Sequence, residues 1–530
     1  MRILLSLSDK TVILPTATTD PINIFCQYFL PATDDRRTEI QQCLRFNVAN
    51  PNIAAIYLLN ERIYTDDELG VSDPKIIQVD IGRRLRFSDV FEYIATNSIQ
   101  GYAVIINSDI FLDTTINTLR SSDLHVEKKM MALLRYEYSY GSSIFGPRHD
   151  SQDTWIIHSA MMMRPEHMRL FAFEFGKPGC DNKLAYLMFV LGYTMVNDPQ
   201  TIKTYHIHAD QTRAYTIADR VTPPFMSLAP YGYPANTITR SLGIHLGDMS
   251  GPTRAFSEVR LDDNLRLHEY VKRQVNSGTP FCIPLAGLLD TNVAVYGEVI
   301  RVSESVQYNT VQFFTTMAPV LAQAAGVRVS SLESILRYAE ASMHALTRGD
   351  ILCCHELYGY DYLQSKSAWE YLRKRCGPSR FVWNAALDIF HYIHSVPWTT
   401  ALQGKRLLII SKDAAKIQMQ LAHHERIYGR NLFPDCAITA IGFDGGDQEY
   451  DTVLSEFMGH VDKIHDLYDV ALVSCGGFGN LICSALVDRG RSAICVGDVL
   501  QMYFGILGNK WEEEVGDVVS LYANEFWITV

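Results

Sequence analysis

Residues 104–113, VIINSDIFLD, indicate which fold the first part of the chain adopts. An apolar run ends in Asn107, Ser108 and Asp109, and a second carboxylate follows at Asp113. A buried strand that carries acidic groups at its carboxyl end is typical of an α/β sheet, because ligands bind at those ends. Carboxylates placed there can hold a divalent cation. The alternative is that the aspartates only form turns, as they often do after strands.

Strands and helices alternate on both sides of that stretch, from about residue 20 to 210. Apolar strands are predicted at 22–30, 53–61, 75–81 and 102–110, and helices at 34–51 and 86–99. Ser88 is a plausible N-cap of the second helix. This alternation predicts a mainly parallel, doubly wound sheet.

A second α/β pattern begins at about residue 265. Helices are predicted at 266–278 and 331–349, and Val/Ile/Leu-rich runs typical of a buried parallel sheet lie at 405–411, 436–443, 469–475 and 492–498. Residues 216–262 are dense in Pro, Gly, Ser and Thr, which predicts an extended connector. We therefore expect two doubly wound, Rossmann-like α/β domains, 20–215 and 263–530, joined by that connector.

The composition is that of a globular protein in a reduced compartment. Hydrophobic residues make up 47% of the 530 residues and charged residues 20%, and the net charge of −12 disfavours a nucleic-acid partner. The eleven cysteines form no Cys-any-any-Cys pair, which favours the cytoplasm, or the host cytoplasm for a viral protein. No segment approaches the ~20 apolar residues of a membrane span, so membrane contact is expected to be peripheral at most.

Two histidines in the segment TYHIHAD, His206 and His208, lie on one face of a predicted strand. Their neutral imidazole nitrogens would complete the coordination of a cation held by Asp109. Such a cation would offset the charge of a departing diphosphate. The alternative is that both histidines are structural.

Two further carboxylates are candidate catalytic groups. Asp181 is expected in the first turn of a helix, where it can accept a proton from a hydroxyl group or only cap the helix. Asp153, in DSQDTW, is the second candidate, with a turn cap as its alternative. Candidate donor-binding side chains are Gln27, Arg36, Arg84, Asn107 and Ser108, with the two arginines as bidentate ligands of phosphate.

Five ordered motifs resemble one known family. QYFLPATDDRRTEI, NSDIFLD, DSQDTW, PGCDNKLAY and HIH together look like the GT-A glycosyltransferases of large algal viruses and bacterial polysaccharide clusters, over residues 20–215. The resemblance implies a nucleoside-diphosphate-sugar donor, a Mn²⁺ or Mg²⁺ ion and an Asp-any-Asp metal motif. Here that motif reads Asn107-Ser108-Asp109, so its first acid is replaced and the metal-binding role falls mainly on Asp109.

In the second half, DVALVSCGGFGNLICSALVDRG predicts a strand, a glycine-rich turn and a helix. Gly476 and Gly477 would let backbone N–H groups approach an anion at the helix N-terminus. The spacing is not the dinucleotide-binding G-x-G-x-x-G, so NAD is not expected. The alternative is that the glycines only allow tight packing of strand against helix.

A second resemblance covers residues 265–515. TPFCIPLAGLLDTNVA, the CGGFGN turn and VGDVLQMYFGILGNKW look like the GT-D class of glycosyltransferases. That class has an Asp-any-Glu motif after its first strand, where this chain reads Leu288-Leu289-Asp290. Only one carboxylate remains, which implies weak or no metal dependence, or a binding module. Asp290 and Gln501 are the candidate donor ligands here, beside the two glycines.

We therefore expect a two-domain, possibly bifunctional glycosyltransferase. It would transfer a hexose, pentose or deoxyhexose from a nucleoside diphosphate to a hydroxyl group of a glycan, carried by a glycoprotein or a polysaccharide. The alternative is a nucleotide-sugar or glycan-binding assembly protein whose second domain is not catalytic.

Overall fold

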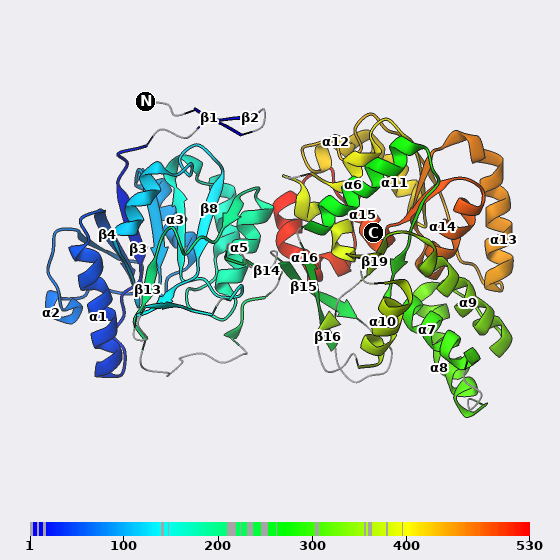
Figure 1. Cartoon of the computed structure of the whole chain (residues 1–530), viewed down its shortest axis with the longest axis horizontal. Helices are drawn as coiled ribbons and strands as arrows, with labels where there is room; N and C mark the ends of the chain where they lie inside the picture. Colours follow the sequence, from blue (N-terminus) through cyan, green and yellow to red (C-terminus); the bar gives the residue numbers. More distant parts are fainter. Residues whose placement is uncertain are drawn as a thin grey trace. The chain divides into compact units, whose positions relative to one another are not determined.

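The computed structural model divides into two compact units, Met1–Ile238 (unit 1) and Thr239–Val530 (unit 2) (Figure 1). It describes residues 4–7, 10–13, 17–138, 142–146, 148–208, 219–222, 224–230, 237–244, 253–260, 262–302, 307–354, 357–358, 363–377, 380–394 and 396–530.

Unit 1 is built on a seven-stranded sheet with the order β12-β8-β11-β6-β3-β4-β5. Its strands are β3 (Ile22–Cys26), β4 (Ile53–Asn60), β5 (Ile76–Asp80), β6 (Tyr102–Ile106), β8 (Lys129–Leu133), β11 (Thr154–His158) and β12 (Thr194–Val196). β11 is antiparallel to both neighbours, and every other pairing in the sheet is parallel. The sheet is therefore mainly parallel but mixed.

Helices cover both faces of this sheet (Figure 1). They include α1 (Asp34–Ala49), α3 (Phe87–Thr96) and α5 (Cys180–Val190). Leu44 of α1 packs with Ile24 and Val104 in one apolar core. Because side chains alternate across a strand, the neighbouring positions face the other way. There Phe87 of α3 meets Trp155 edge to face, with ring centroids 5.1 Å apart.

The N-terminus of α3 differs from the prediction. Arg86, not Ser88, is its N-cap residue. The Asp89 carboxylate accepts a hydrogen bond from the Arg86 backbone N–H at 2.9 Å and pairs with Arg83 at 2.6 Å. A carboxylate in the first turn therefore satisfies the free N–H group, and the predicted cap at Ser88 is wrong.

A small second sheet positions the histidines. Its order is β10-β9-β13-β7, formed by β7 (Ile110–Leu112), β9 (Tyr136–Glu137), β10 (Ser143–Ile144) and β13 (Thr204–His206). β13 is antiparallel to β7, with His206 opposite Ile110, and parallel to β9, with His206 beside Glu137. His208 lies beyond the end of the strand rather than on it. This pairing places the His206–His208 segment next to Asp109.

Unit 2 contains a parallel five-stranded sheet with the order β17-β25-β24-β22-β23. These strands are β17 (Cys282–Ile283), β22 (Arg406–Ser411), β23 (Ala437–Ile441), β24 (Val470–Ser474) and β25 (Ser492–Cys495). The last four match the predicted apolar runs. A second parallel sheet joins β18 (Leu285–Ala286), β19 (Leu352–Cys354) and β21 (Phe381–Trp383).

The longer helices of unit 2 are α6 (Asp262–Ser277), α7 (Leu288–Val302), α8 (Gln307–Ala325), α9 (Leu332–Arg348), α10 (Leu363–Cys376), α13 (Tyr450–Val461), α14 (Gly479–Asp488) and α16 (Asn509–Tyr522). Helix α9 has the predicted caps. The Ser331 side chain accepts a hydrogen bond from the Ser334 N–H at 3.1 Å, and Gly349 is the C-cap. The helix predicted at 331–349 is therefore confirmed.

The predicted connector, 216–262, contains regular strands. These are β14 (Phe225–Ser227), β15 (Thr237–Ile244) and β16 (Thr253–Arg260), and β16 pairs antiparallel with β20 (Leu357–Tyr358). The high Pro, Gly and Ser content concealed the β-branched residues of TITRSLGI, which favour a strand.

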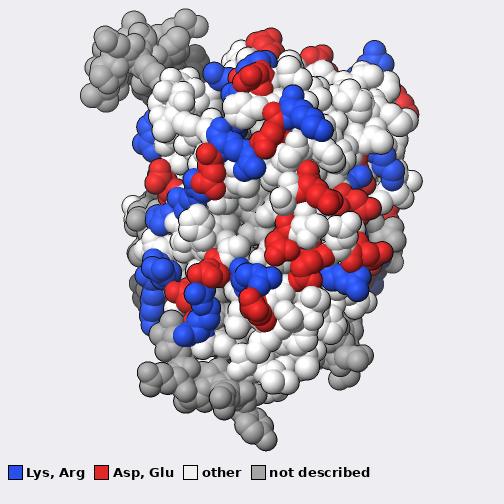
Figure 2. Space-filling view, turned by 90° about the vertical axis from the view of Figure 1, so that its right-hand side faces the viewer, with Lys and Arg blue, Asp and Glu red and all other residues white. Residues whose placement is uncertain are grey.

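Acidic and basic side chains both lie on the face of unit 2 that includes α9 and α13, with acidic side chains gathered near its middle (Figure 2). Ion pairs there include Arg337–Glu333 at 2.9 Å and Arg489–Asp462 at 2.7 Å. On this face the charges are mixed rather than gathered into one basic surface. None of the described helices is long and apolar enough to cross a bilayer.

Candidate functional site

One cavity in unit 1, of about 1160 Å³, collects side chains from distant parts of the sequence. Residues 107–109 follow β6, Arg135 follows β8, and Asp153 precedes β11. Because β11 runs antiparallel, its start lies at the carboxyl ends of β6 and β8. Ten predicted site residues line the cavity: Gln27, Arg36, Arg84, Asn107, Ser108, Asp109, Asp153, Asp181, His206 and His208.

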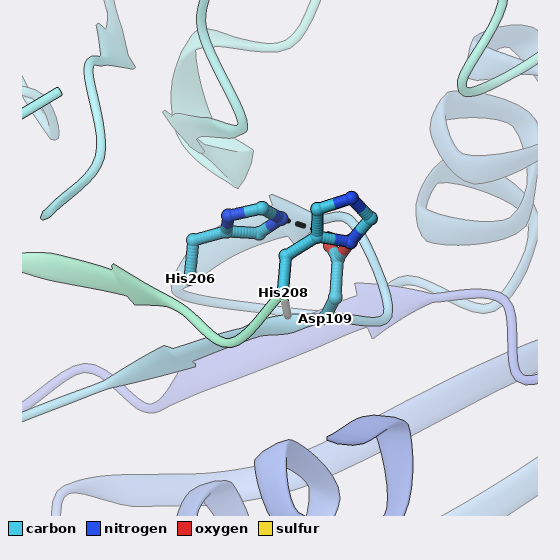
Figure 3. Close-up of side chains that lie close together, drawn as sticks. All are labelled: Asp109, His206 and His208. Atoms are coloured by element: carbon cyan, nitrogen blue, oxygen red, sulfur yellow. Dashed lines mark hydrogen bonds and ion pairs between the residues drawn. The ribbon is translucent and has the colours of Figure 1, made fainter. Parts of the chain in front are cut away.

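Three of these side chains form a candidate metal site. The potential ligand atoms of Asp109, His206 and His208 all lie within 4.8 Å of one another. The two imidazole rings are stacked next to the Asp109 carboxylate (Figure 3), with centroids 5.0 Å apart. Within the residues that the structure describes, this is the only such group of three or more side chains.

His206 is held between two carboxylates. Its Nε2 lies 3.1 Å from Asp109 Oδ2, and its Nδ1 lies 3.0 Å from Glu137 Oε2. Burial alone would lower the pKa of His206, but the two carboxylates raise it to about 9. Without a metal, His206 is therefore an imidazolium that donates a hydrogen bond to each acid. Glu137 was missed in the sequence because it precedes His206 by 69 positions and meets it only through strand pairing.

Arg36 is the second cation at Asp109. Its guanidinium donates to Asp109 Oδ2, to Nδ1 of His208 at 2.7 Å and to Glu39 at 2.8 Å. Burial would raise the pKa of Asp109, but His206 and Arg36 hold it well below its usual range. Burial and the nearby Arg36 lower the pKa of His208, which is therefore neutral at neutral pH.

These residues fit a divalent cation. Oδ1 of Asp109 is buried and has no hydrogen-bond partner within the described part of the chain, so one carboxylate oxygen remains available. His208 is neutral and can coordinate through a lone pair. A carboxylate with two imidazoles is a donor set that first-row transition metals accept, and His206 would join it by releasing its Nε2 proton when the metal binds. The cluster could therefore hold one such ion.

Asp181 lines the same cavity in the first turn of α5. Its carboxylate accepts a hydrogen bond from the Gln152 backbone N–H at 3.1 Å, while Gly179 is the N-cap of the helix. Burial, together with the nearby Asp153 carboxylate, raises the pKa of Asp181 to about 7, although backbone N–H groups that donate to it act in the opposite direction. A carboxylate with such a pKa can accept a proton at neutral pH.

Each carboxylate oxygen of Asp153 has a partner within the cavity. Asp153 accepts a hydrogen bond from the Asn107 side-chain amide at 3.0 Å and pairs with Arg135 at 2.6 Å. Arg135 also pairs with Glu137 at 2.7 Å. The charges Arg36, Asp109, His206, Glu137, Arg135 and Asp153 therefore alternate in sign along one connected chain, termed here the charge chain.

The remaining donor-binding candidates of unit 1 differ in how far their side chains are already engaged in contacts within the protein. Gln27 bonds to Glu61 and to the backbone of Arg83 and Leu85, so its side chain is used in joining loops. Arg84 is 43% exposed, lines the cavity, donates to the Phe175 carbonyl at 3.0 Å and lies 3.9 Å from a Glu174 carboxylate oxygen. Ser108 also lines the cavity.

In unit 2 the glycine-rich turn packs tightly against neighbouring helices. A Cβ atom on Gly477 would lie 2.6 Å from Val327 and 2.7 Å from the Tyr338 hydroxyl. Gly476 has φ +51° and lies against the Ala325 carbonyl. Close packing is therefore sufficient to explain both glycines, and Gly477→Val would disturb the core rather than report on a ligand.

The other two candidate donor ligands of unit 2 are Asp290 and Gln501. Burial raises the pKa of Asp290 to about 7, which makes it a weak cation ligand at neutral pH. Gln501, in α15 (Leu500–Tyr503), donates to Asp413 at 2.7 Å and accepts from the Trp511 indole at 3.4 Å. Gln501 thus joins the loops that follow β22 and β25.

No protein-family model matches the chain, and no curated protein matches it in sequence. Among 38 matching solved chains is a mannosyltransferase from Pyrobaculum calidifontis in complex with GDP-Man and Mn²⁺. It is 11% identical, with a TM-score of 0.27 over 38% of this chain, which spans 60% of the mannosyltransferase. A glycosyltransferase (DUF1792) from Streptococcus sanguinis is 12% identical, with a TM-score of 0.26 over 47% of this chain and 83% of the other.

A further structure of domain of unknown function 1792, described as a distinct glycosyltransferase fold, is 13% identical, with a TM-score of 0.23. It matches 47% of this chain and 85% of its own. At these scores the likeness does not bear on the chemistry of the site, which rests on the residues themselves.

Proposed function

We propose that unit 1 is a metal-dependent glycosyltransferase that uses a nucleoside-diphosphate sugar. The observation that carries the proposal is that one cavity holds both a potential cation-binding cluster and a half-buried carboxylate with a raised pKa. Sugar transfer from a diphosphate needs both, because negative charge develops on the leaving group and a proton leaves the acceptor hydroxyl.

In the proposed reaction, the bond between the anomeric carbon and the diphosphate oxygen breaks, and a bond to the acceptor oxygen forms. Asp181 takes the hydroxyl proton if the transfer inverts the anomeric configuration. Arg36 and Arg84 bind phosphate oxygens, and Asp153 positions Asn107 and Arg135. Asp109, His206 and His208 would hold a cation that offsets the charge of the departing nucleoside diphosphate.

The acceptor is proposed to be a hydroxyl group of a growing glycan. The volume of the cavity, about 1160 Å³, is enough for a nucleotide sugar together with an acceptor sugar. Unit 2 is proposed to be either a second transferase domain or a glycan-binding module. Its packed glycine turn and the raised pKa of Asp290 favour the module.

The test is to incubate the purified full-length chain with UDP- and GDP-sugars, Mn²⁺ and oligosaccharide acceptors. Acceptor-dependent release of the nucleoside diphosphate, together with a product heavier by one sugar, would support the transferase. Saturable nucleotide-sugar binding without any turnover would instead identify a binding protein.

The donor set predicts a preference for Mn²⁺ over Mg²⁺. Mg²⁺ favours oxygen ligands and keeps much of its water, whereas Mn²⁺ accepts the imidazoles of His206 and His208. Titration calorimetry of the full chain should show Mn²⁺ binding at least ~10-fold tighter than Mg²⁺. Equal affinities would mean that the histidines are not ligands.

A further inference from the structure

Arg36 occupies an unusual place for a cation. It extends from α1 into the candidate metal site and contacts two of the three potential ligands, Asp109 and His208. Its side chain is only 18% exposed, and Glu39, one turn along the helix, holds the same guanidinium. A positive charge therefore already lies where the cluster would receive a dication.

A dication and this guanidinium compete for the same groups. The N–H groups of Arg36 use a lone pair of Asp109 Oδ2 and the Nδ1 lone pair of His208. Two positive charges that share one carboxylate repel each other, most strongly in a buried site where water screens little. Binding of a metal at Asp109 therefore weakens the hold of the cluster on Arg36.

We propose that Arg36 is an internal counter-cation that keeps the metal cluster closed and is released by the metal into the cavity to bind the donor diphosphate. Arg36 already lines that cavity, together with Phe29 and Thr33. Glu39 contacts Arg36 independently of the cluster and can keep the side chain near the cavity wall. The claim that Arg36 binds the donor diphosphate rests on the proposed transferase function. The claim that Arg36 competes with the metal does not.

Two linked effects follow from this arrangement. Without Arg36, the metal no longer competes with a resident cation, so it binds more tightly when no nucleotide is present. The freed guanidinium gives the diphosphate a ligand that is available only after the metal has bound. Metal and diphosphate therefore bind with positive cooperativity, which is reciprocal between the two sites.

The test titrates Mn²⁺ into the full-length protein by calorimetry, without nucleotide. Arg36→Gln should bind Mn²⁺ at least ~5-fold more tightly than wild type, the lower end of ordinary coupling between sites. Arg37→Gln is the matched control, because Arg37 is its neighbour on α1, is 43% exposed and pairs with Asp34. That control should bind Mn²⁺ like wild type.

A second titration uses UDP and GDP at saturating Mn²⁺. Arg36→Gln should bind whichever of them wild type binds at least ~10-fold more weakly, which is the loss of one charge-assisted contact to phosphate. Arg36→Lys keeps the positive charge and should return Mn²⁺ affinity toward that of wild type. Circular dichroism establishes that each variant is folded.

Unchanged or weaker Mn²⁺ binding by folded Arg36→Gln overturns the counter-cation role, as does equal tightening in Arg36→Lys. Unchanged UDP and GDP affinity overturns the release toward the diphosphate. If no nucleotide sugar is ever cleaved, the transferase function fails, but the Mn²⁺ titration still decides the role of Arg36.

Discussion

Replacing Asp109 by asparagine should remove Mn²⁺ binding from unit 1 and reduce sugar transfer by ~10³-fold or more, since a Lewis acid contributes several kcal/mol to such a step. The amide keeps the shape of the carboxylate but loses the charge that attracts the cation. Calorimetry with Mn²⁺ and an assay for released nucleoside diphosphate measure the two effects separately.

Asparagine is preferred to alanine because Asp109 is buried between Arg36 and His206. Both substitutions remove the compensating charge, but alanine would also leave the N–H groups of Arg36 and His206 without an acceptor and open a cavity, whereas the asparagine oxygen can still accept a hydrogen bond. The matched control is Asp113→Asn. Asp113 bonds to the Thr115 N–H and the Tyr205 hydroxyl and lies outside the cavity lining. Wild-type transfer by Asp109→Asn, or full activity in excess chelator, would refute the metal site.

Asp181→Asn should lower kcat by ~10²-fold or more, the usual scale for losing a proton acceptor, with little change in donor affinity. Because burial raises the pKa of Asp181 to about 7, only the form above that pKa can accept the proton. In wild type, kcat should therefore fall as pH decreases through about 7. A pH profile of kcat for both proteins tests this, since the variant should lack that acidic limb.

Asp181→Asn should lower kcat but raise the folding stability of the protein at neutral and higher pH. The folded state holds the Asp181 proton more tightly than the unfolded chain, so wild type loses stability as pH rises from ~4 through about 7. Asp181→Asn should therefore be more stable than wild type above pH 7, by roughly 1–3 kcal/mol, and equal to it at acidic pH.

Asp198→Asn is the control, because Asp198 accepts from the Thr201 N–H outside the cavity lining. An unchanged kcat in Asp181→Asn would leave Asp181 with a structural role only.

The strand that carries Asp109 could be predicted from the sequence, since a continuous apolar run that ends in polar residues is typical of a buried strand. The residue types of Asp181, His206 and His208 also marked them as candidates. The direction of β11 could not be predicted, because the apolar run TWIIH fits a parallel or an antiparallel strand equally well. That direction brings Asp153 to the carboxyl end of β6, where it contacts Asn107.

The contacts that the site residues make with one another could not be predicted from the local sequence. Glu137 meets His206 only through the pairing of β9 with β13, which no motif encodes. Arg36 was predicted as a phosphate ligand, and its contacts with Asp109 and His208 arise from the packing of α1 beside β7. In unit 2, the glycine pattern could not distinguish an anion site from the close approach of Val327 and Tyr338.

The charge chain constrains how this cavity can change in evolution. Each of its members neutralises the next, from Arg36 through Asp109, His206, Glu137 and Arg135 to Asp153. A single substitution leaves a neighbouring buried charge without its partner, which is among the costliest of point changes. Related chains should therefore vary at these positions in compensating pairs, so that an Arg135 replacement is accompanied by a change at Glu137 or Asp153. The specificity of the cavity would then diversify through the uncharged and rim positions instead.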